Sequence, residues 1–175
     1  FKTVSEASFN KSDLKKNYEK LDNAIKENLN FIKKRIINFH KAIKIRDLKT
    51  KDGIFNLLGQ IHKPINKIGL YAPGGKAVYP SSILMTALVA RVAGSKEINL
   101  FFPSSSDKAK TLMLGTAHLA GITNAYNFGG AHAIAAMAYG TETISKSDKI
   151  FGPGNKYVAE AKRQVFGDVG IDSFA

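Results

Sequence analysis

The chain has 175 residues, of which 44% are hydrophobic and none is cysteine or tryptophan, and its 26 Lys and Arg against 14 Asp and Glu give a net charge of +12. It is too apolar to be disordered throughout, and without cysteine it has no disulfide framework, thiolate metal site or cysteine nucleophile. The apolar-rich run at residues 80–90 is shorter than the roughly 20 residues that a bilayer requires. We therefore expect a soluble, cytoplasmic protein without a membrane partner.

The positive charge is concentrated in the N-terminal third of the chain. Residues 1–66 carry 15 basic and 7 acidic residues, whereas residues 67–175 carry 11 and 7. A basic segment can bind nucleic acid, so a nucleic-acid-associated protein is one hypothesis. These basic residues lack interleaved aromatic platforms and a docking motif, and a solvated helix face is also rich in lysine. We therefore predict no nucleic-acid partner.

The first third of the chain has the period of an α-helix. Nine apolar residues recur at an average spacing of about 3.6 residues, the helical repeat. They are Leu14, Tyr18, Leu21, Ile25, Leu29, Ile32, Ile36, Phe39 and Ile43. With Asp22 as an N-cap, the pattern predicts helices over residues 11–20 and 23–44, in a long N-terminal helical arm that spans residues 1–48. The apolar stripe needs a partner, which is either the rest of this chain or a second subunit.

Residues 49–66 combine turn and strand signals. The letters KTKDG at their start are typical of a turn. Two short strands are expected at residues 54–58 and 60–62, joined near Gly59, and Pro64 restricts further pairing there to a sheet edge. We interpret this segment as short strands and a linker.

From residue 67 onward, strands and helices alternate. Apolar strands are expected to begin near residues 67, 97, 122 and 149, about 25–30 residues apart, which is the length of a βα repeat. Helices are expected over residues 81–93, from a cap at 104–107 to 120, over 131–139 and over 156–166, with a further strand at 169–172. Continuous apolar strands that alternate with helices predict an α/β fold, in which a parallel sheet carries helices on both faces.

Three strand ends lead into glycine-rich turns. Their sequences are YAPGG at residues 71–75, NFGGA at 127–131 and FGPGN at 151–155. Ligands of open α/β sheets bind beyond the carboxyl ends of the strands, and glycine beside a helix N-terminus favours phosphate or pyrophosphate. None of the three is a GxGxxG fingerprint or a P-loop. The alternative is that tight βα turns need glycine for structural reasons alone.

Single residues in these turns are candidates to contact a ligand. Tyr71 ends its strand, where its ring either stacks on a base or ribose or is a core tyrosine with a capped hydroxyl. Asn155 stands at a helix start, where an N-cap and a ligand contact are compatible. His132 follows GGA at another helix start and either hydrogen-bonds a ligand or faces solvent. The pattern is typical of a nucleotide- or phosphate-binding half.

No constellation of catalytic or metal-ligating residues is visible in the sequence. The four histidines include no pair with the i, i+4 spacing of a helical zinc site, and no carboxylate cluster lies beside them. No GxSxG motif, triad or paired-carboxylate signature stands out. We therefore expect neither catalytic nor metal-binding residues in this segment.

Three stretches together resemble one family, the histidinol dehydrogenases. They are IGLYAPGG, YNFGGAHAIAAMAYGTET and DKIFGPGNKYVAEAKRQVFG. The resemblance runs over residues 5–175 and implies an enzyme of the last step of histidine biosynthesis. Such enzymes are intertwined homodimers that oxidise L-histidinol through an aldehyde, histidinal, to L-histidine, with two NAD per turnover and one zinc ion.

The resemblance also assigns roles to residues of this chain. It makes residues 67–175 an incomplete Rossmann-like domain, and it maps NAD contacts onto Tyr71, His132 and Asn155. His132 stands where the family usually has glutamine. A histidine still offers one hydrogen bond, but its side chain is shorter and directs that bond differently.

The family chain is much longer than this one. Its substrate motif, zinc ligands and catalytic Glu–His pair are expected downstream of Ala175, and a further portion is expected upstream. This segment would then supply the NAD side only, and the 175-residue chain alone is expected not to oxidise histidinol. A non-catalytic remnant that binds nucleotide or dimerises is the alternative. Because a cut sheet edge and the apolar stripe would be exposed, we expect self-association, which light scattering tests.

Overall fold

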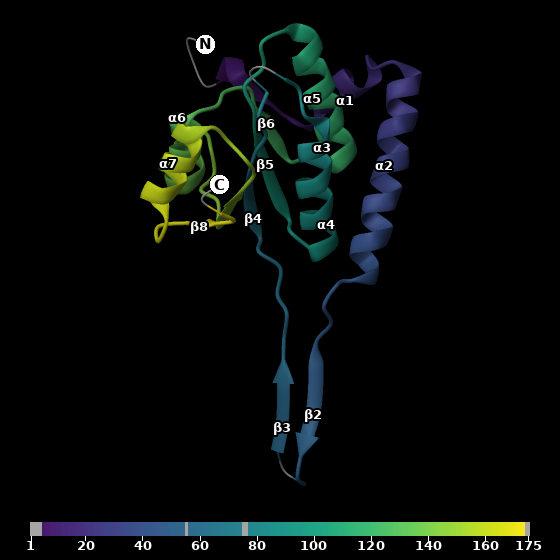
Figure 1. Ribbon diagram of the computed structural model, residues 1–175, viewed down its shortest axis with the longest axis vertical. Helices are drawn as coiled ribbons and strands as arrows, with labels where there is room; N and C mark the ends of the chain where they lie inside the picture. Colours follow the sequence, from purple (N-terminus) through teal and green to yellow (C-terminus); the bar gives the residue numbers. More distant parts are fainter. Residues whose placement is uncertain (1–4, 55, 75–76, 174–175) are drawn as a thin grey trace.

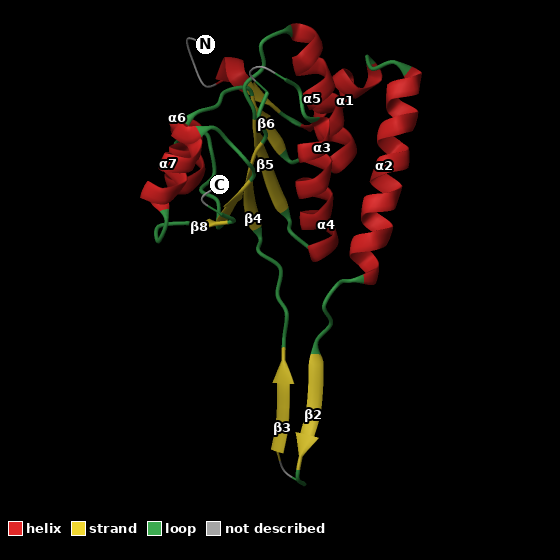
Figure 2. Ribbon diagram, in the orientation of Figure 1, coloured by secondary structure: helices red, strands yellow, loops and turns green. Residues whose placement is uncertain are grey.

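The computed structural model describes residues 5–54, 56–74 and 77–173. Its centre is a six-stranded sheet with the order β1-β6-β5-β4-β7-β8 (Figures 1 and 2). The strands are β1 (Ser8–Phe9), β4 (Lys67–Tyr71), β5 (Glu97–Phe101), β6 (Asn124–Tyr126), β7 (Lys149–Phe151) and β8 (Gly170–Ile171). The α/β class is the one that the sequence predicts.

The sheet is mixed, where the sequence predicted a parallel one. Strands β6, β5, β4, β7 and β8 run parallel, whereas β1 pairs antiparallel with β6. Ser8 lies opposite Tyr126 and Phe9 opposite Ala125. A strand of two residues is too short to produce an alternating pattern in the sequence. It nevertheless covers the edge of β6, which would otherwise present unpaired backbone groups.

Helices cover both faces of the sheet (Figure 2). One face carries α1 (Lys11–Glu19), α2 (Asn23–Ala42), α3 (Pro80–Ile83), the π-helical turn η2 (Leu84–Leu88), α4 (Val89–Ala93) and α5 (Asp107–Ala120), and the other carries α6 (Ala131–Tyr139) and α7 (Lys156–Val165). A 3-10 turn, η1 (Ser5–Ala7), precedes β1. In the described part of the chain, no helix has the length and apolarity to cross a membrane.

The two N-terminal helices form an outer layer of one helical face rather than the arm that the sequence predicted. α1 packs on α5, and α2 packs on η2 and α4 (Figure 1). The α1–α5 contact is close because Gly115 has no side chain, and a Cβ there would lie 3.1 Å from the Cα of Tyr18 in α1. Phe39 and Ile43, near the end of α2, stay exposed. The buried members of the apolar stripe are Leu14, Leu21, Leu29 and Ile36. For these positions the rest of this chain is the partner, which helical periodicity alone does not identify.

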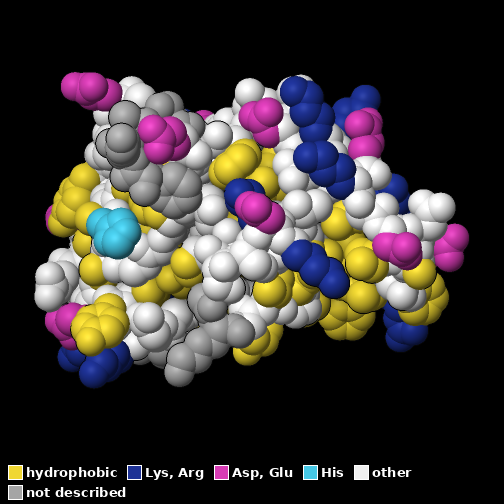
Figure 3. All heavy atoms as spheres, turned by 90° about the horizontal axis from the view of Figure 1, so that it is seen from above, with side chains coloured by type: hydrophobic (Ala, Val, Ile, Leu, Met, Phe, Trp, Pro, Cys, Tyr) yellow, Lys and Arg dark blue, Asp and Glu magenta, His cyan; other side chains and the backbone are white. Residues whose placement is uncertain are grey.

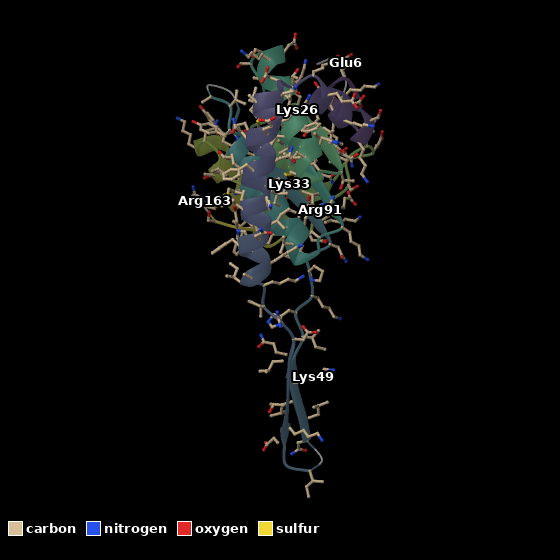
Figure 4. All side chains as sticks on the ribbon, turned by 90° about the vertical axis from the view of Figure 1, so that its right-hand side faces the viewer. Glu6, Lys26, Lys33, Lys49, Arg91 and Arg163 are labelled. Carbon is tan, nitrogen blue, oxygen red and sulfur yellow. The ribbon has the colours of Figure 1, made fainter. Side chains whose placement is uncertain are left out.

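A two-stranded antiparallel hairpin projects away from the sheet and its helices (Figures 1 and 4). β2 (Leu48–Asp52) pairs with β3 (Asn56–Gln60), and every residue of both strands is exposed. Phe55, which the sequence placed in a strand, lies outside the described residues. The exposed apolar side chains of the hairpin include Leu48, Leu57 and Leu58.

The predicted strands at residues 54–58 and 60–62, joined near Gly59, are displaced from those of the structure. Gly53 lies in the turn, with a φ of +75° that glycine adopts without strain. Gly59 lies within the ladder, opposite Lys49. The letters KTKDG therefore belong partly to a strand. With no buried face, the hairpin has no alternation of apolar and polar residues to reveal its register.

The environment of His118, late in α5, predicts a pH-dependent stability. Its ring is half-buried and lies 5.3 Å from that of Tyr18, measured between centroids. Burial, and then the positive charges of Lys15 and Lys33, lower the pKa of His118 against a smaller opposing effect of Glu19. As pH falls below about 6.5, the unfolded chain therefore takes up this proton before the folded one does. We expect stability to decrease from there until the pH passes the folded-state pKa.

Denaturant unfolding between about pH 8 and about pH 5 measures this dependence. The variant His118→Gln has no titrating ring, so its free energy of unfolding should change less over that range than the wild-type value. Equal pH dependence in the two proteins would contradict the assignment to His118.

Candidate functional site

The direction in which the sheet is built reverses at β4. The chain passes from β4 to β5 and β6 on one side, and α6 then carries it back to β7 on the other side of β4. The connection after β4 runs to α3 on one face, whereas that after β7 runs to α7 on the other (Figure 1). In doubly wound sheets, ligands bind where neighbouring connections diverge, beyond the carboxyl ends of the strands. Figure 3 looks down on this end, where side chains of both charges lie among apolar ones.

The glycine-rich loops at this edge pack directly on one another. A Cβ on Gly74 would lie 2.2 Å from the carbonyl oxygen of Pro103, and one on Gly152 would lie 1.9 Å from that of Tyr71. One on Gly129 would lie 2.8 Å from the hydroxyl of Tyr71. These glycines therefore have a structural reason, close approach of the strand ends, beside any role toward a ligand. Gly75, the last residue of YAPGG, lies outside the described residues.

Tyr71 is the residue around which these loops meet. Its side chain is buried, with 5% exposed, among core residues that include Phe101 and Tyr126. The Tyr71 hydroxyl accepts a hydrogen bond from the N–H of Gly130 at 3.2 Å. This geometry matches a core tyrosine with a capped hydroxyl, and it gives no exposed ring face for stacking. Tyr71 instead holds the start of α6 against the end of β4.

His132 lies in the first turn of α6 and is exposed. Its ring stacks on that of Phe128, with centroids 5.8 Å apart and planes inclined by 13°. The helix is capped by the backbone of Gly130, with no side-chain hydrogen bond to the N-terminal amides. The N-terminus of α6 therefore offers backbone donors and an imidazole on the same turn.

Asn155 is the N-cap of α7. Its Oδ1 accepts from the amides of Tyr157 and Val158 at 3.0 and 3.1 Å. The side chain is exposed, and its Nδ2 forms no hydrogen bond within the described residues. The cap thus occupies the oxygen and leaves the nitrogen as a donor. The loop of His132 contacts the hydroxyl of Tyr71 through Gly130, and the loop of Asn155 approaches the backbone carbonyl of Tyr71 through Gly152.

Sequence reasoning missed an ion pair beneath this edge. Nζ of Lys162 donates to Oδ1 of Asp172 and to the carbonyl oxygen of Gly152, both at 2.6 Å. Oδ2 of Asp172 accepts from the N–H of Gly152 at 2.7 Å. We call these three residues the Gly152 clamp. Helical spacing could have indicated Lys162, because it follows Val158 by four residues and precedes Val165 by three on the buried face of α7.

The carboxyl group of Asp172 has a lowered pKa. Burial alone would raise it, but hydrogen bonds from Lys162 and from the amides of Gly152 and Ser173, with the charge of Lys162, outweigh that effect. The carboxylate form is therefore favoured, and the clamp is an ion pair at neutral pH.

The described residues contain no group of three or more His, Asp, Glu or Cys side chains that could hold a metal ion. His132 is the histidine at the carboxyl edge, whereas His40 lies in the last turn of α2 and His118 in that of α5. The donors that this part of the chain gathers at the edge are backbone amides, an imidazole and a carboxamide. They fit an anionic organic ligand and do not fit a zinc ion.

A family profile and two relatives point to the same family. The histidinol dehydrogenase profile matches residues 1–175. A histidinol dehydrogenase of Neisseria meningitidis serogroup A is 43% identical over 174 residues, which are 99% of this chain and 41% of that protein. One of Acinetobacter baylyi is 46% identical over 171 residues, which are 98% of this chain and 40% of that protein.

The fold leads to the same family. The crystal structure of histidinol dehydrogenase from Elizabethkingia anophelis matches with a TM-score of 0.88 and 35% identity, over 97% of this chain and 40% of that one. The chain thus spans about two fifths of the length of its relatives. With its whole sequence matched by the family profile and its sheet matched by a solved member, the chain belongs to the histidinol dehydrogenase family.

Proposed function

We propose that this chain is the NAD-binding portion of an enzyme that oxidises L-histidinol through histidinal to L-histidine. The observation that carries the proposal is the reversal of strand order at β4, where the loops of His132 and Asn155 both contact Tyr71. This is the place where doubly wound folds bind dinucleotides. The whole enzyme would be a cytoplasmic homodimer, and residues 67–175 would be its incomplete Rossmann-like domain.

Each group at the edge has a function toward a dinucleotide in this proposal. The open N-terminus of α6 offers backbone N–H groups and the positive end of a helix dipole to the pyrophosphate. His132 and Nδ2 of Asn155 supply side-chain hydrogen bonds. Tyr71 acts mainly by fixing Gly130, the first residue of that helix N-terminus. When bound, NAD accepts the hydride of the alcohol or aldehyde substrate.

The zinc ion and the catalytic bases of the proposed reaction would come from outside this chain. The described residues include no cluster of potential metal ligands. In this proposal they bind and orient NAD, and the groups that remove protons lie outside them. We therefore expect no formation of NADH when the purified 175-residue chain is mixed with L-histidinol and NAD+. Formation of NADH by this chain alone would contradict the proposal that the catalytic groups lie outside it.

Replacing Asn155 with aspartate separates the cap from the ligand contact. Asn155→Asp keeps an oxygen that accepts from Tyr157 and Val158, and a negative charge at a helix N-terminus is stabilising. It removes the Nδ2 donor and places a negative charge beside an anionic dinucleotide. We expect the melting temperature to be kept or raised, and NAD+ affinity by calorimetry to fall by about tenfold or more.

Two variants of His132 test the ligand contact at the N-terminus of α6. His132→Gln introduces the residue that the family usually has, and His132→Ala removes the side-chain hydrogen bond. We expect the alanine variant to bind NAD+ more weakly than wild type and the glutamine variant to bind at least as well as wild type. Equal affinity of wild type, Asn155→Asp and His132→Ala would contradict the proposed site.

A further inference from the structure

The Gly152 clamp joins three elements at one point. Lys162 comes from the inner face of α7, Asp172 directly follows β8, and Gly152 directly follows β7. Both polar backbone groups of Gly152 are bonded, its N–H to Asp172 and its carbonyl oxygen to Lys162. The peptide units on either side of Gly152 therefore each have one orientation. That orientation sets the direction in which residues 153–155 leave the sheet.

Stability alone does not require an ion pair at this position. The side chain of Lys162 is 2% exposed and that of Asp172 is 28% exposed. Removing an ammonium group from water is unfavourable, and apolar side chains of similar volume often stabilise a protein as well as a buried ion pair does. A methionine could fill the space of Lys162, but it could not bond the carbonyl oxygen of Gly152. In addition to filling the space, the charged pair fixes the orientation of the peptide units on either side of Gly152.

The segment that the clamp holds leads to Asn155. Gly152 is three residues before Asn155, which caps the same helix that carries Lys162. The clamp and the cap therefore attach the loop to α7 at two points, one on its inner face and one at its N-terminus. The close approach of Gly152 to the carbonyl of Tyr71 adds a third point of contact.

We propose that Lys162 and Asp172 are positioning residues for the dinucleotide. They do not touch it, but they hold residues 152–155 in the conformation in which Asn155 and the start of α7 meet the ligand. The proposal rests on the proposed function, because the ligand is taken to be NAD. Without the clamp, the loop would have to become ordered on binding, and the free-energy cost of that ordering would weaken the affinity for NAD.

The test compares Lys162→Met with Arg163→Met in the 175-residue chain. Both variants replace a basic residue of α7 with the same apolar one, but Arg163 is exposed and pairs with Glu160 on the surface. NAD+ binding is measured by calorimetry at a temperature at which circular dichroism shows every variant to be folded. We expect Lys162→Met to raise the Kd by about tenfold or more, and Arg163→Met to change it by less than about twofold.

Amide hydrogen exchange gives a second readout that does not depend on NAD. In Lys162→Met, the amide of Gly152, which bonds Asp172, and those of Tyr157 and Val158, which bond the Asn155 cap, should lose protection while those of β4 and β5 keep it. Arg163→Met should leave all of them unchanged. If Lys162→Met does not fold, Lys162→Met/Asp172→Asn replaces it, since this pair of changes leaves no unpaired charge.

The outcomes separate this proposal from the function on which it rests. An unchanged Kd with a lowered melting temperature would show that the clamp is only structural and would overturn the proposal. A wild-type chain that does not bind NAD+ would overturn the proposed function. In that case, unchanged exchange at the three amides would also overturn the positioning of the loop, whereas their loss of protection would support it.

Discussion

Replacing Gly152 with alanine is expected to destabilise the protein by about 3 kcal/mol or more. The φ of Gly152 is +115°, a conformation that residues with a side chain rarely adopt. The new Cβ would also lie 1.9 Å from the carbonyl oxygen of Tyr71 and 2.9 Å from its carbonyl carbon. These are backbone atoms of the central strand β4, so they cannot turn away as a flexible side chain would. Since small domains are stable by about 5–15 kcal/mol, the loss is a large part of the total.

Gly167 provides the matched control. Its φ is +106°, and a Cβ there would have no neighbour within 4 Å. Gly167→Ala therefore carries the backbone strain without the clash and should cost only about 1–2 kcal/mol. Denaturant unfolding of both variants measures the difference. If Gly152→Ala were no less stable than Gly167→Ala, the close contact with Tyr71 would not be a constraint on this loop.

Removing the carboxylate of the Gly152 clamp is the second change with a large expected effect. Asp172→Ala leaves the ammonium group of Lys162 buried without its counterion, which should cost about 3–5 kcal/mol. Lys162→Met leaves the opposite partner, a carboxylate that is 28% exposed and can be hydrated. It should therefore cost less, about 1–2 kcal/mol for the lost hydrogen bonds.

A double-mutant cycle tests this asymmetry. In Lys162→Met/Asp172→Ala neither charge is left alone, so the double variant should be more stable than Asp172→Ala. Free energies of unfolding for the four proteins give the coupling directly. If the free-energy changes of the two single variants simply add in the double variant, Lys162 and Asp172 do not act as a pair.

The ion pair between Lys162 and Asp172 should stop contributing to stability in acid. Because the folded state lowers the pKa of Asp172, the carboxylate contributes stability above its unfolded value of about 3.9 and loses that contribution as pH falls through the folded-state pKa. The difference in stability between wild type and Asp172→Ala should therefore narrow as the pH decreases below about 4.

Local sequence signals predicted several strands and helices of the central sheet well. The helix predicted at residues 131–139 coincides with α6, and the strands predicted to begin near residues 67 and 149 begin there as β4 and β7. Each is bounded by glycine, proline or a capping residue, so its limits are visible in the sequence. β1 and the hairpin were less predictable, because two residues have no period and an exposed ladder has no apolar face.

The site was predictable to a similar extent. The glycine-rich turns indicated which edge of the sheet to examine, and the cap formed by Asn155 follows from local rules. The buried position of Tyr71 and its bond to Gly130 depend on how separate loops pack, which no local pattern contains. The partnership of Lys162 with Asp172 is also a tertiary fact, since strand β8 has to lie beside β7 for the two side chains to meet.

The exposed hairpin is a place where the backbone could be cut without separating the rest of the fold. Two-stranded ladders are only marginally stable by themselves, and exposed loop tips are where chains tolerate nicks and insertions. The part before the tip remains attached elsewhere, through the pairing of β1 with β6 and the packing of α1 on α5. A break at the tip would therefore leave two pieces that hold each other by noncovalent contacts. New chain termini, or an inserted reporter domain, would be accommodated there at little cost to the sheet.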